Sequence, residues 1–306
     1  MKVLHTADLH IGALAGDLRL DESGLQHRVQ ITLDMLDYLI DYANQSCQVL
    51  VLAGDNFDTH NPSTRLLFEF NKRIQTTKVP VIIILGQHDL PKSCRSHNAF
   101  PYQYNKNSLI FVVTKPKTIN ISGFQFVCIP YSQQILMDDN WRHLNHYLKY
   151  NSTSESIIIT HFPFTGAKIS DKFALRSGLP KAVFDDVKFK KALLGDIHRA
   201  QILGADQKVF YPGSPIYVSR AESGDKGFFV HDLTQNTHEF IKLNPEILPE
   251  LKQVIKQKKE RPTPTNKVVI KELLKKEFGQ NTNRMIAILE EIGMGEVLSN
   301  SIYAAG

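Results

Sequence analysis

The chain has 306 residues, of which 42% are hydrophobic, 9% aromatic and 22% charged, and these ordinary globular values exclude fibrous, low-complexity and disordered chains. Its length suggests about two domains. Lys and Arg outnumber Asp and Glu by 36 to 31, and the net charge of +5 favours a polyanionic partner only slightly, well short of a protein that binds DNA by charge alone.

The cysteines and the first residues bear on the cellular compartment. Cys47, Cys94 and Cys128 form no Cys-x-x-Cys pair, and an odd number cannot all be paired within one chain, so a disulfide scaffold and a cysteine zinc site are disfavoured. Asp8 falls where a signal peptide needs an uninterrupted apolar region, and no later apolar run reaches the length of a membrane span. We therefore expect a cytoplasmic protein with no membrane partner.

Short apolar runs rich in β-branched residues predict buried strands in the first part of the chain. These runs lie at residues 48–52, 79–85, 126–129, 156–160 and 192–194. Apolar residues at helical spacing predict helices over residues 28–42 and 63–74. Strands and helices thus alternate, which indicates an α/β fold.

After Leu203 the pattern changes. Short strand signals at residues 208–211, 227–231 and 238–243 are expected to complete the main sheet. The chain then becomes polar and basic, with prolines that forbid a continuous helix, before apolar residues return at helical spacing over 268–278 and 283–292. We expect three parts, which are a main domain (1–243), a basic, proline-containing linker (244–266) and a helical hairpin (267–306).

Polar residues immediately follow the predicted strands, in the loops where α/β proteins form their sites. They are Asp8, His10, Asp55, Asp58, Gln87, His88, Asp89, His161, Asp196 and His198. One such residue alone is usually a turn residue or a structural one, but five groups in order indicate a shared site. Carboxylate, imidazole and amide ligands suit divalent ions, and two ions about 3.5–4 Å apart are a standard device for phosphoester hydrolysis.

These groups resemble the motifs of the calcineurin-like metallophosphoesterases. The matching segments are Asp8-Leu9-His10, Gly54-Asp55-Asn56-Phe57-Asp58, Gly86-Gln87-His88-Asp89, Thr160-His161 and Gly195-Asp196-Ile197-His198. More narrowly, residues 5–12 and Tyr211-Pro212-Gly213-Ser214-Pro215 are similar to signatures of the SbcD-type DNA nuclease subunits of double-strand-break repair. The resemblance covers roughly residues 1–243 and implies a four-layer α/β/β/α sandwich.

The resemblance also implies how the ligands divide between two metal ions. Asp8, His10 and His198 would hold the first ion, Asp55 would bridge the two ions, and Gln87, His161 and Asp196 would hold the second. The family normally has Asn in place of Gln87 and His in place of Asp196, so both departures fall on the second ion. An oxygen-rich set of ligands favours Mn²⁺, with Mg²⁺ as the alternative.

Further residues receive roles from the same resemblance. His88 would act at the scissile phosphate or the leaving oxygen, and Asp89 would orient its imidazole as in a general acid pair. Asp58 would support the site by contacting a ligand side chain and not an ion itself. Arg65, Arg95 and His97 flank the metal loops and are expected to contact phosphates of the substrate.

The implied function is that of a metal-dependent DNA nuclease, with exonuclease or endonuclease action. Its implied partners are DNA, a second copy in a homodimer, and an SbcC-like coiled-coil ATPase that the C-terminal hairpin would dock. The chain is closest in size to phage subunits, which is compatible with action in a bacterial host cytoplasm. Two alternatives stay open, namely a scaffold that binds DNA and the ATPase without cutting, and a small-molecule phosphodiesterase of the same superfamily.

Overall fold

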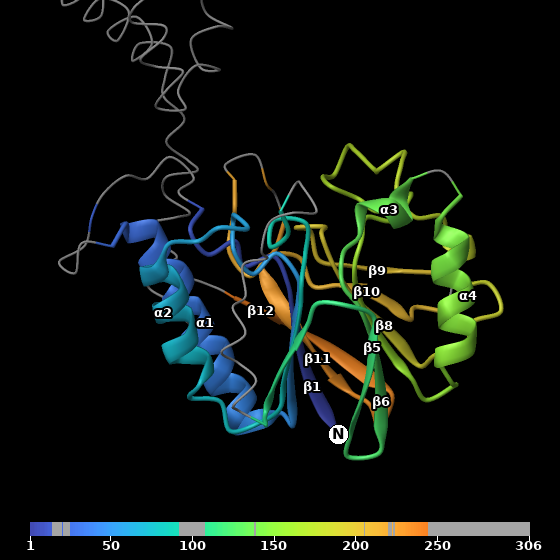
Figure 1. Cartoon of the computed structure of the whole chain (residues 1–306), viewed down its shortest axis with the longest axis horizontal. Helices are drawn as coiled ribbons and strands as arrows, with labels where there is room; N and C mark the ends of the chain where they lie inside the picture. Colours follow the sequence, from blue (N-terminus) through green and yellow to red (C-terminus); the bar gives the residue numbers. More distant parts are fainter. Residues whose placement is uncertain are drawn as a thin grey trace, which may run out of the picture. The chain divides into compact units, whose positions relative to one another are not determined.

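The computed structural model describes residues 1–13, 20, 25–91, 108–137, 139–204, 206–219, 222 and 224–243. The predicted linker (244–266) and helical hairpin (267–306) lie outside the described residues. Within the described part, the chain is an α/β protein with two mixed sheets of six strands each (Figure 1).

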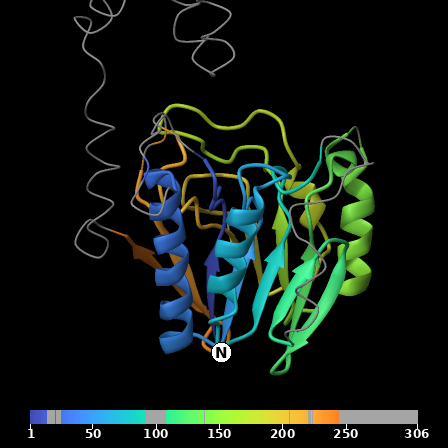
Figure 2. The ribbon, with the colours of Figure 1, turned by 60° about the vertical axis from the view of Figure 1, so that its left-hand side comes forward.

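In the first sheet four neighbouring strands are parallel, and one further strand pairs antiparallel with both of its neighbours. In spatial order the strands are β12 (Thr237–Lys242), β11 (Gly227–Asp232), β1 (Lys2–Thr6), β2 (Val49–Ala53), β3 (Val81–Ile84) and β4 (Ile110–Val113). Helices α1 (His27–Ser46) and α2 (Thr64–Ile74) lie side by side on its outer face (Figure 2). The predicted helices and their buried faces are therefore present, and Ser63 caps α2 by accepting a hydrogen bond from the Leu66 N–H.

The second sheet is also mixed, because its two edge strands run antiparallel to their neighbours. In spatial order the strands are β5 (Lys117–Ile121), β6 (Phe124–Ile129), β7 (Ile157–His161), β8 (Lys191–Gly195), β10 (Val209–Tyr211) and β9 (Gln201–Leu203). The remaining helices are α3 (Gln133–Leu136), α4 (Trp141–Asn151) and the 3₁₀ helix η2 (Lys181–Phe184).

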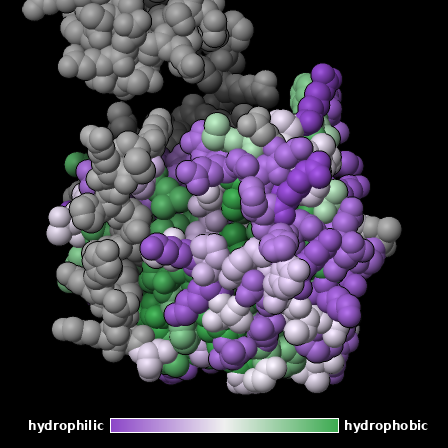
Figure 3. Space-filling model, turned by 45° about the vertical axis from the view of Figure 1, so that its right-hand side comes forward, coloured by the Kyte–Doolittle hydropathy of each residue, from purple (hydrophilic) through white to green (hydrophobic). Residues whose placement is uncertain are grey.

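The central strands are buried on both faces, which explains their continuous apolar sequences. Side chains alternate along a strand, so Leu50 of β2 packs with α1 and α2 while Val51 packs against the second sheet. In β7, Ile159 likewise faces the first sheet while Ile158 packs with α4 and η2. Three apolar layers therefore hold the helices and sheets together. On the face in Figure 3, hydrophobic residues gather in one band within a largely hydrophilic surface.

The late strands do not all join one sheet, contrary to the prediction that they complete the main sheet. Strand β10 belongs to the second sheet, whereas β11 and β12 extend the first. The connection between β10 and β11 therefore crosses from one sheet to the other. Alternation in a short segment predicts a strand but does not encode its partner, because pairing depends on contacts far away in sequence.

No helix in the described part of the chain combines the length and apolar character that crossing a membrane requires.

The two sheets approach closely at Gly195, the last residue of β8. A Cβ atom at this position would lie 2.1 Å from the carbonyl oxygen of Ala53 and 2.6 Å from Nδ1 of His161. Real Cβ atoms do not come this close to other heavy atoms, so only glycine fits between β2 and β7 here. The close contact brings the ends of strands from both sheets together.

Gly195→Ala is expected to lower the free energy of unfolding by about 1–3 kcal/mol, because the added methyl group must displace β2 or the His161 ring. Urea denaturation followed by circular dichroism measures the effect. An unchanged denaturation midpoint would contradict the close approach of the two sheets at this residue.

Candidate metal centre

The loops that follow the central strands of both sheets lie at the same end of the domain (Figure 2), and these loops carry the polar residues from Asp8 to His198 that were predicted to bind ions. The loop after β1 is tied to the loop after β2, since the N–H groups of Asp8 and His10 donate to the carbonyls of Gly54 and Asp55, both at 3.0 Å. Asp8, His10 and Asp55 adopt left-handed backbone conformations, with φ of 56°, 45° and 49°. Such strain costs about 1–3 kcal/mol per residue and concentrates at functional sites.

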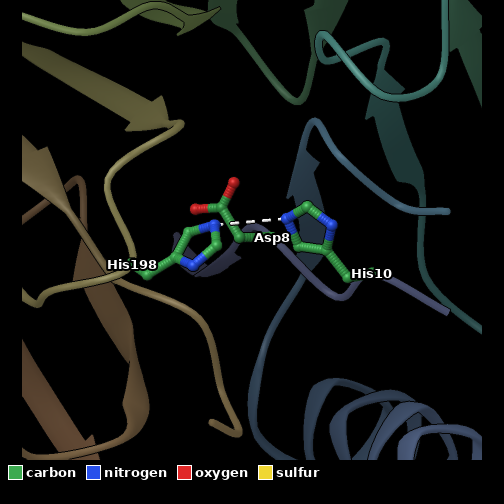
Figure 4. A group of neighbouring side chains, drawn as sticks. All are labelled: Asp8, His10 and His198. Carbon is green, nitrogen blue, oxygen red and sulfur yellow. Dashed lines mark hydrogen bonds between the residues drawn. The ribbon is translucent and has the colours of Figure 1, made fainter. Parts of the chain in front are cut away.

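The first group of potential ligands is Asp8, His10 and His198 (Figure 4). One ligand atom from each lies within 4.8 Å of the others. The Nε2 atoms of His10 and His198 are 3.2 Å apart, and Nε2 of His10 lies 3.7 Å from Oδ2 of Asp55. Adjacent ligands of an octahedral ion with bonds of about 2.1 Å lie about 3 Å apart. The spacing therefore fits one divalent ion.

The second group is Asp8, Asp55 and His161. Nε2 of His161 lies 3.4 Å from Oδ2 of Asp55, and 3.9 Å from Oδ1 of both Asp8 and Asp196. The ring is fully buried, yet this nitrogen has no hydrogen-bond partner among the described residues. A buried nitrogen without a partner, surrounded by carboxylates, is suited to bind a cation. The residues therefore fit a second divalent ion.

In each of the three imidazoles, those of His10, His161 and His198, Nδ1 makes a hydrogen bond to the protein. Nδ1 of His10 bonds to Oδ1 of Asp58 at 3.1 Å, Nδ1 of His161 to the carbonyl of Ala53 at 2.7 Å, and Nδ1 of His198 to a carboxylate oxygen of Glu222 at 2.9 Å. A carbonyl or an ionised carboxylate can only accept, so each Nδ1 carries the proton. In the neutral form of each ring, Nε2 then carries the lone pair that an ion needs.

Charges at the centre strongly perturb one another. Burial is the largest single effect on the pKa of His161 and lowers it, but the carboxylates of Asp55, Asp8 and Asp196 together outweigh burial and raise the pKa to about 10. Burial would raise the pKa of Asp55, but the imidazoles of His161 and His10 hold it below its usual range. For Asp196, burial raises the pKa to about 6, with Asp8 adding to the effect and His161 opposing it. Negative charge is therefore in excess at this site.

Gln87 and His88 lie at the surface beside these ligands. Both are exposed, and they line a pocket of about 640 Å³ together with Asp58 and Tyr131. The His88 N–H donates to Oδ1 of Asp55 at 2.7 Å, and the ring Nδ1 donates to the carbonyl of Asp58 at 2.9 Å. With Nδ1 bonded to the chain, Nε2 is the ring nitrogen left for a substrate. His88 also forms a close group with His10 and Asp55.

The structure does not support the predicted orienting role of Asp89. Its fully buried carboxylate accepts hydrogen bonds from the backbone N–H groups of Asn56, Phe57 and Gly86, and from the Asn56 side chain. The His88 ring is instead bonded to the Asp58 carbonyl. Asp89 therefore holds the loop after β2 against the loop after β3, because the turn directs its side chain inward.

The structure describes two of the four residues that were predicted to support the ligands or to contact substrate phosphates. Asp58 lies beside His10, and this hydrogen bond is the largest cause that lowers the pKa of Asp58. Arg65 is exposed in the first turn of α2. Arg95 and His97 lie outside the described residues.

Glu222 contacts His198 from the connection between β10 and β11 and was not predicted from the sequence. This connection is polar and follows no predicted strand end, so the pattern that identified the other residues gives no signal here. The nearest hint is the Tyr211-Pro212-Gly213-Ser214-Pro215 motif, in which the Ser214 hydroxyl donates to Glu222 at 3.3 Å.

Asp196→Asn is expected to stabilise the metal-free protein at pH 8. Its pKa is raised from 3.8 to about 6, so the stability contributed by the protonated form is lost as the pH rises through 6. A pKa difference of this size corresponds to roughly 3 kcal/mol, and Asn removes the penalty of ionisation. Urea denaturation with a chelator should show the gain at pH 8 and a smaller gain at pH 5.

With added Mn²⁺ at pH 8, the wild type should instead be more stable than Asp196→Asn, because the Asp196 carboxylate would then be paired with an ion. A variant that is less stable than the wild type without metal at pH 8 would contradict the excess of negative charge.

The chain is similar to one protein family profile and to several solved structures. The family profile described as calcineurin-like phosphoesterase matches residues 1–200. A novel archaeal phosphodiesterase is 14% identical, with a TM-score of 0.41, over 79% of this chain and 100% of its own. A dimetal phosphatase from Danio rerio is 13% identical, with a TM-score of 0.48, over 75% of this chain and 91% of its own.

The family match spans more than half of the chain and includes every residue of the two ligand groups. The chain therefore belongs to the calcineurin-like phosphoesterase family and is a metal-dependent phosphoesterase.

Proposed function

We propose that the chain is a two-metal phosphodiester hydrolase whose substrate is DNA. One observation carries the hydrolytic part of the proposal. The carboxylates of Asp8, Asp55 and Asp196 surround the unpartnered Nε2 atom of His161 at 3.4–3.9 Å. Such a cluster is stable when cations offset the charge, and divalent ions are the cations that act on phosphoesters.

Bound divalent ions would supply Lewis-acid stabilisation of phosphate charge and a water nucleophile of lowered pKa. The chain's residues hold and orient these ions. In the proposed arrangement Asp55 lies between them, and the other ligands divide into two sets, which are Asp8, His10 and His198, and Gln87, His161 and Asp196. The first set needs no rearrangement, whereas Gln87 is exposed and would have to turn its amide oxygen inward.

His88 is the proposed general acid. In its protonated form the ring donates through Nδ1 to the Asp58 carbonyl and keeps a second proton at Nε2. That proton would pass to the leaving oxygen of the phosphodiester, which would otherwise depart as an alkoxide. The exposed position of His88 in the pocket allows contact with a large substrate.

DNA as the substrate is supported by the resemblance of residues 5–12 and 211–215 to SbcD-type nucleases. A hairpin of residues 167–175 adds a physical argument. Its Leu175 N–H donates to the Ala167 carbonyl at 2.8 Å, and its Ile169 N–H donates to the Phe173 carbonyl at 3.0 Å. Ile169 and Phe173 are 50% and 66% exposed. Apolar and aromatic side chains at an exposed tip can stack on bases.

The hairpin is fixed beside the metal ligands. Backbone groups of Lys168 make two hydrogen bonds with the Gln201 side chain, both at 2.8 Å, and Asp171 pairs with Arg199 at 2.5 Å. Arg199 directly follows His198 in the chain, and Gln201 lies two residues further on. Exposed Lys168 and Lys172 add positive charge for phosphates. A strand held at His88 could therefore also contact this hairpin.

A small-molecule phosphodiesterase is the second candidate. The family match favours it, because the description of that family names phosphoesterases and no nucleic acid. The non-cleaving scaffold is a further alternative that rests on the departures at Gln87 and Asp196. The homodimer and the docking of residues 267–306 on an SbcC-like ATPase remain proposals that rest on the resemblance. The cytoplasmic location remains a proposal that rests on the cysteines and on Asp8.

The protein is expected to cleave duplex or single-stranded DNA with Mn²⁺ and to lose this activity with a chelator. His88→Ala should lower kcat by about 10²–10⁴-fold, because the leaving oxygen loses its proton donor, while Mn²⁺ affinity is unchanged. Gel assays of labelled DNA and calorimetric Mn²⁺ titrations measure both effects. Hydrolysis of a chromogenic phosphodiester without DNA cleavage would favour the second candidate. Two bound ions without any hydrolysis would favour the scaffold.

Phe173→Ala combined with Lys172→Ala should raise KM for DNA by roughly 5- to 100-fold, the effect of losing one stacked base and one phosphate contact. Hydrolysis of a chromogenic phosphodiester should not change, because it is too small to reach the hairpin. Phe68→Ala is the matched control, since Phe68 of α2 is 62% exposed. Equal losses on both substrates would contradict a DNA contact at the hairpin.

A further inference from the structure

A buried ammonium group lies behind the first ligand group. Lys226 is 5% exposed and donates to three acceptors, which are Oε2 of Glu222 at 2.6 Å, Oγ of Ser214 at 2.6 Å and the carbonyl of His198 at 2.9 Å. Lysine is almost never buried unless it is paired. Its three donors are thus matched by three acceptors, one of which belongs to a predicted metal ligand.

Glu222 connects this lysine to the His198 ring. One of its oxygens accepts from Nδ1 of His198 at 2.9 Å and from the Ser219 N–H at 3.0 Å, and the other accepts from Lys226. Because the buried ammonium group of Lys226 lies 2.6 Å from Oε2, the Glu222 carboxylate is paired with a positive charge and acts as an acceptor towards the His198 ring.

We propose that Glu222 and Lys226 are positioning residues that clamp His198, with Glu222 holding the ring and Lys226 holding both Glu222 and the His198 backbone. The ring then presents Nε2 towards Asp8 and His10, where the first ion would bind (Figure 4). A carboxylate behind a ligating imidazole makes that imidazole a stronger ligand and fixes its tautomer. The inference rests on the proposed two-metal centre.

The connection that carries Glu222 is itself held against the His198 loop. Gly213 has a φ of +72°, and a Cβ there would lie 2.8 Å from the Ala200 nitrogen and 3.0 Å from the His198 carbonyl oxygen. The backbone of the Tyr211-Pro212-Gly213-Ser214-Pro215 motif therefore packs directly on the residues that follow His198. This contact places Ser214 next to Lys226 and gives the motif a role in building the metal centre.

Glu222→Gln tests the clamp, because it keeps the size of the side chain and removes its charge. The double variant Glu222→Gln with Lys226→Met removes both charges, so that no unpaired lysine is left in the interior. Glu239→Gln, an exposed position on β12, is the matched control. Calorimetric titration with Mn²⁺ should show one of two ions bound about 10–100-fold more weakly in both test variants, with the other ion unaffected.

A second measurement needs neither metal nor activity. Nitrogen-15 NMR of the His198 ring in the metal-free wild type should show the proton on Nδ1, and the variants should show a mixture of tautomers. Wild-type affinity for both ions in the double variant would overturn the inference, as would a wild-type ring with its proton on Nε2. A wild type that binds fewer than two ions would instead contradict the proposed function, so the two failures are distinguishable.

Discussion

The carboxylates of Asp8, Asp55 and Asp196 lie 3.4–3.9 Å from Nε2 of His161, at the carboxyl ends of strands from the two sheets. Burying like charges this close is unfavourable in a folded chain without cations. The backbone nevertheless holds Asp8, Asp55 and Asp196 in left-handed conformations, with φ of 56°, 49° and 96°. Divalent ions at the proposed centre would offset the repulsion between these carboxylates, and the surrounding hydrogen bonds hold the strained backbone in place.

The orientation of the ligand side chains at the metal centre depends on how the two sheets pack. His161 is held by the carbonyl of Ala53, a residue of the opposite sheet, so its ring bridges the interface. His198 is held by Glu222, which lies on the connection that crosses from β10 to β11. Because ligand orientation depends on contacts between sheets, loosening that interface would also weaken the ion sites.

The clustering of Asp8, His10, Asp55, His161 and His198 could be predicted from the sequence, because these residues follow strands whose carboxyl ends share an edge. Asp89 was misassigned because it is next to His88 in sequence, whereas the turn directs its carboxylate to Asn56 and Phe57. Glu222 gave no signal, since it lies 24 residues beyond His198 in a polar connection. The sequence also did not indicate which sheet β10 joins, because alternation along a strand does not specify its neighbours.

Asp196 also bears on which phosphoester suits the site. Two divalent ions carry four positive charges, and the carboxylates of Asp8, Asp55 and Asp196 would leave a net charge of about +1 while the imidazoles stay neutral. A phosphodiester carries one negative charge, whereas a phosphate monoester carries about −1.5 to −2 near neutral pH. A histidine in place of Asp196 would leave one more positive charge. On the proposed two-metal centre, Asp196 would therefore suit a singly charged diester, since a monoester would bring an excess of negative charge into a largely buried site.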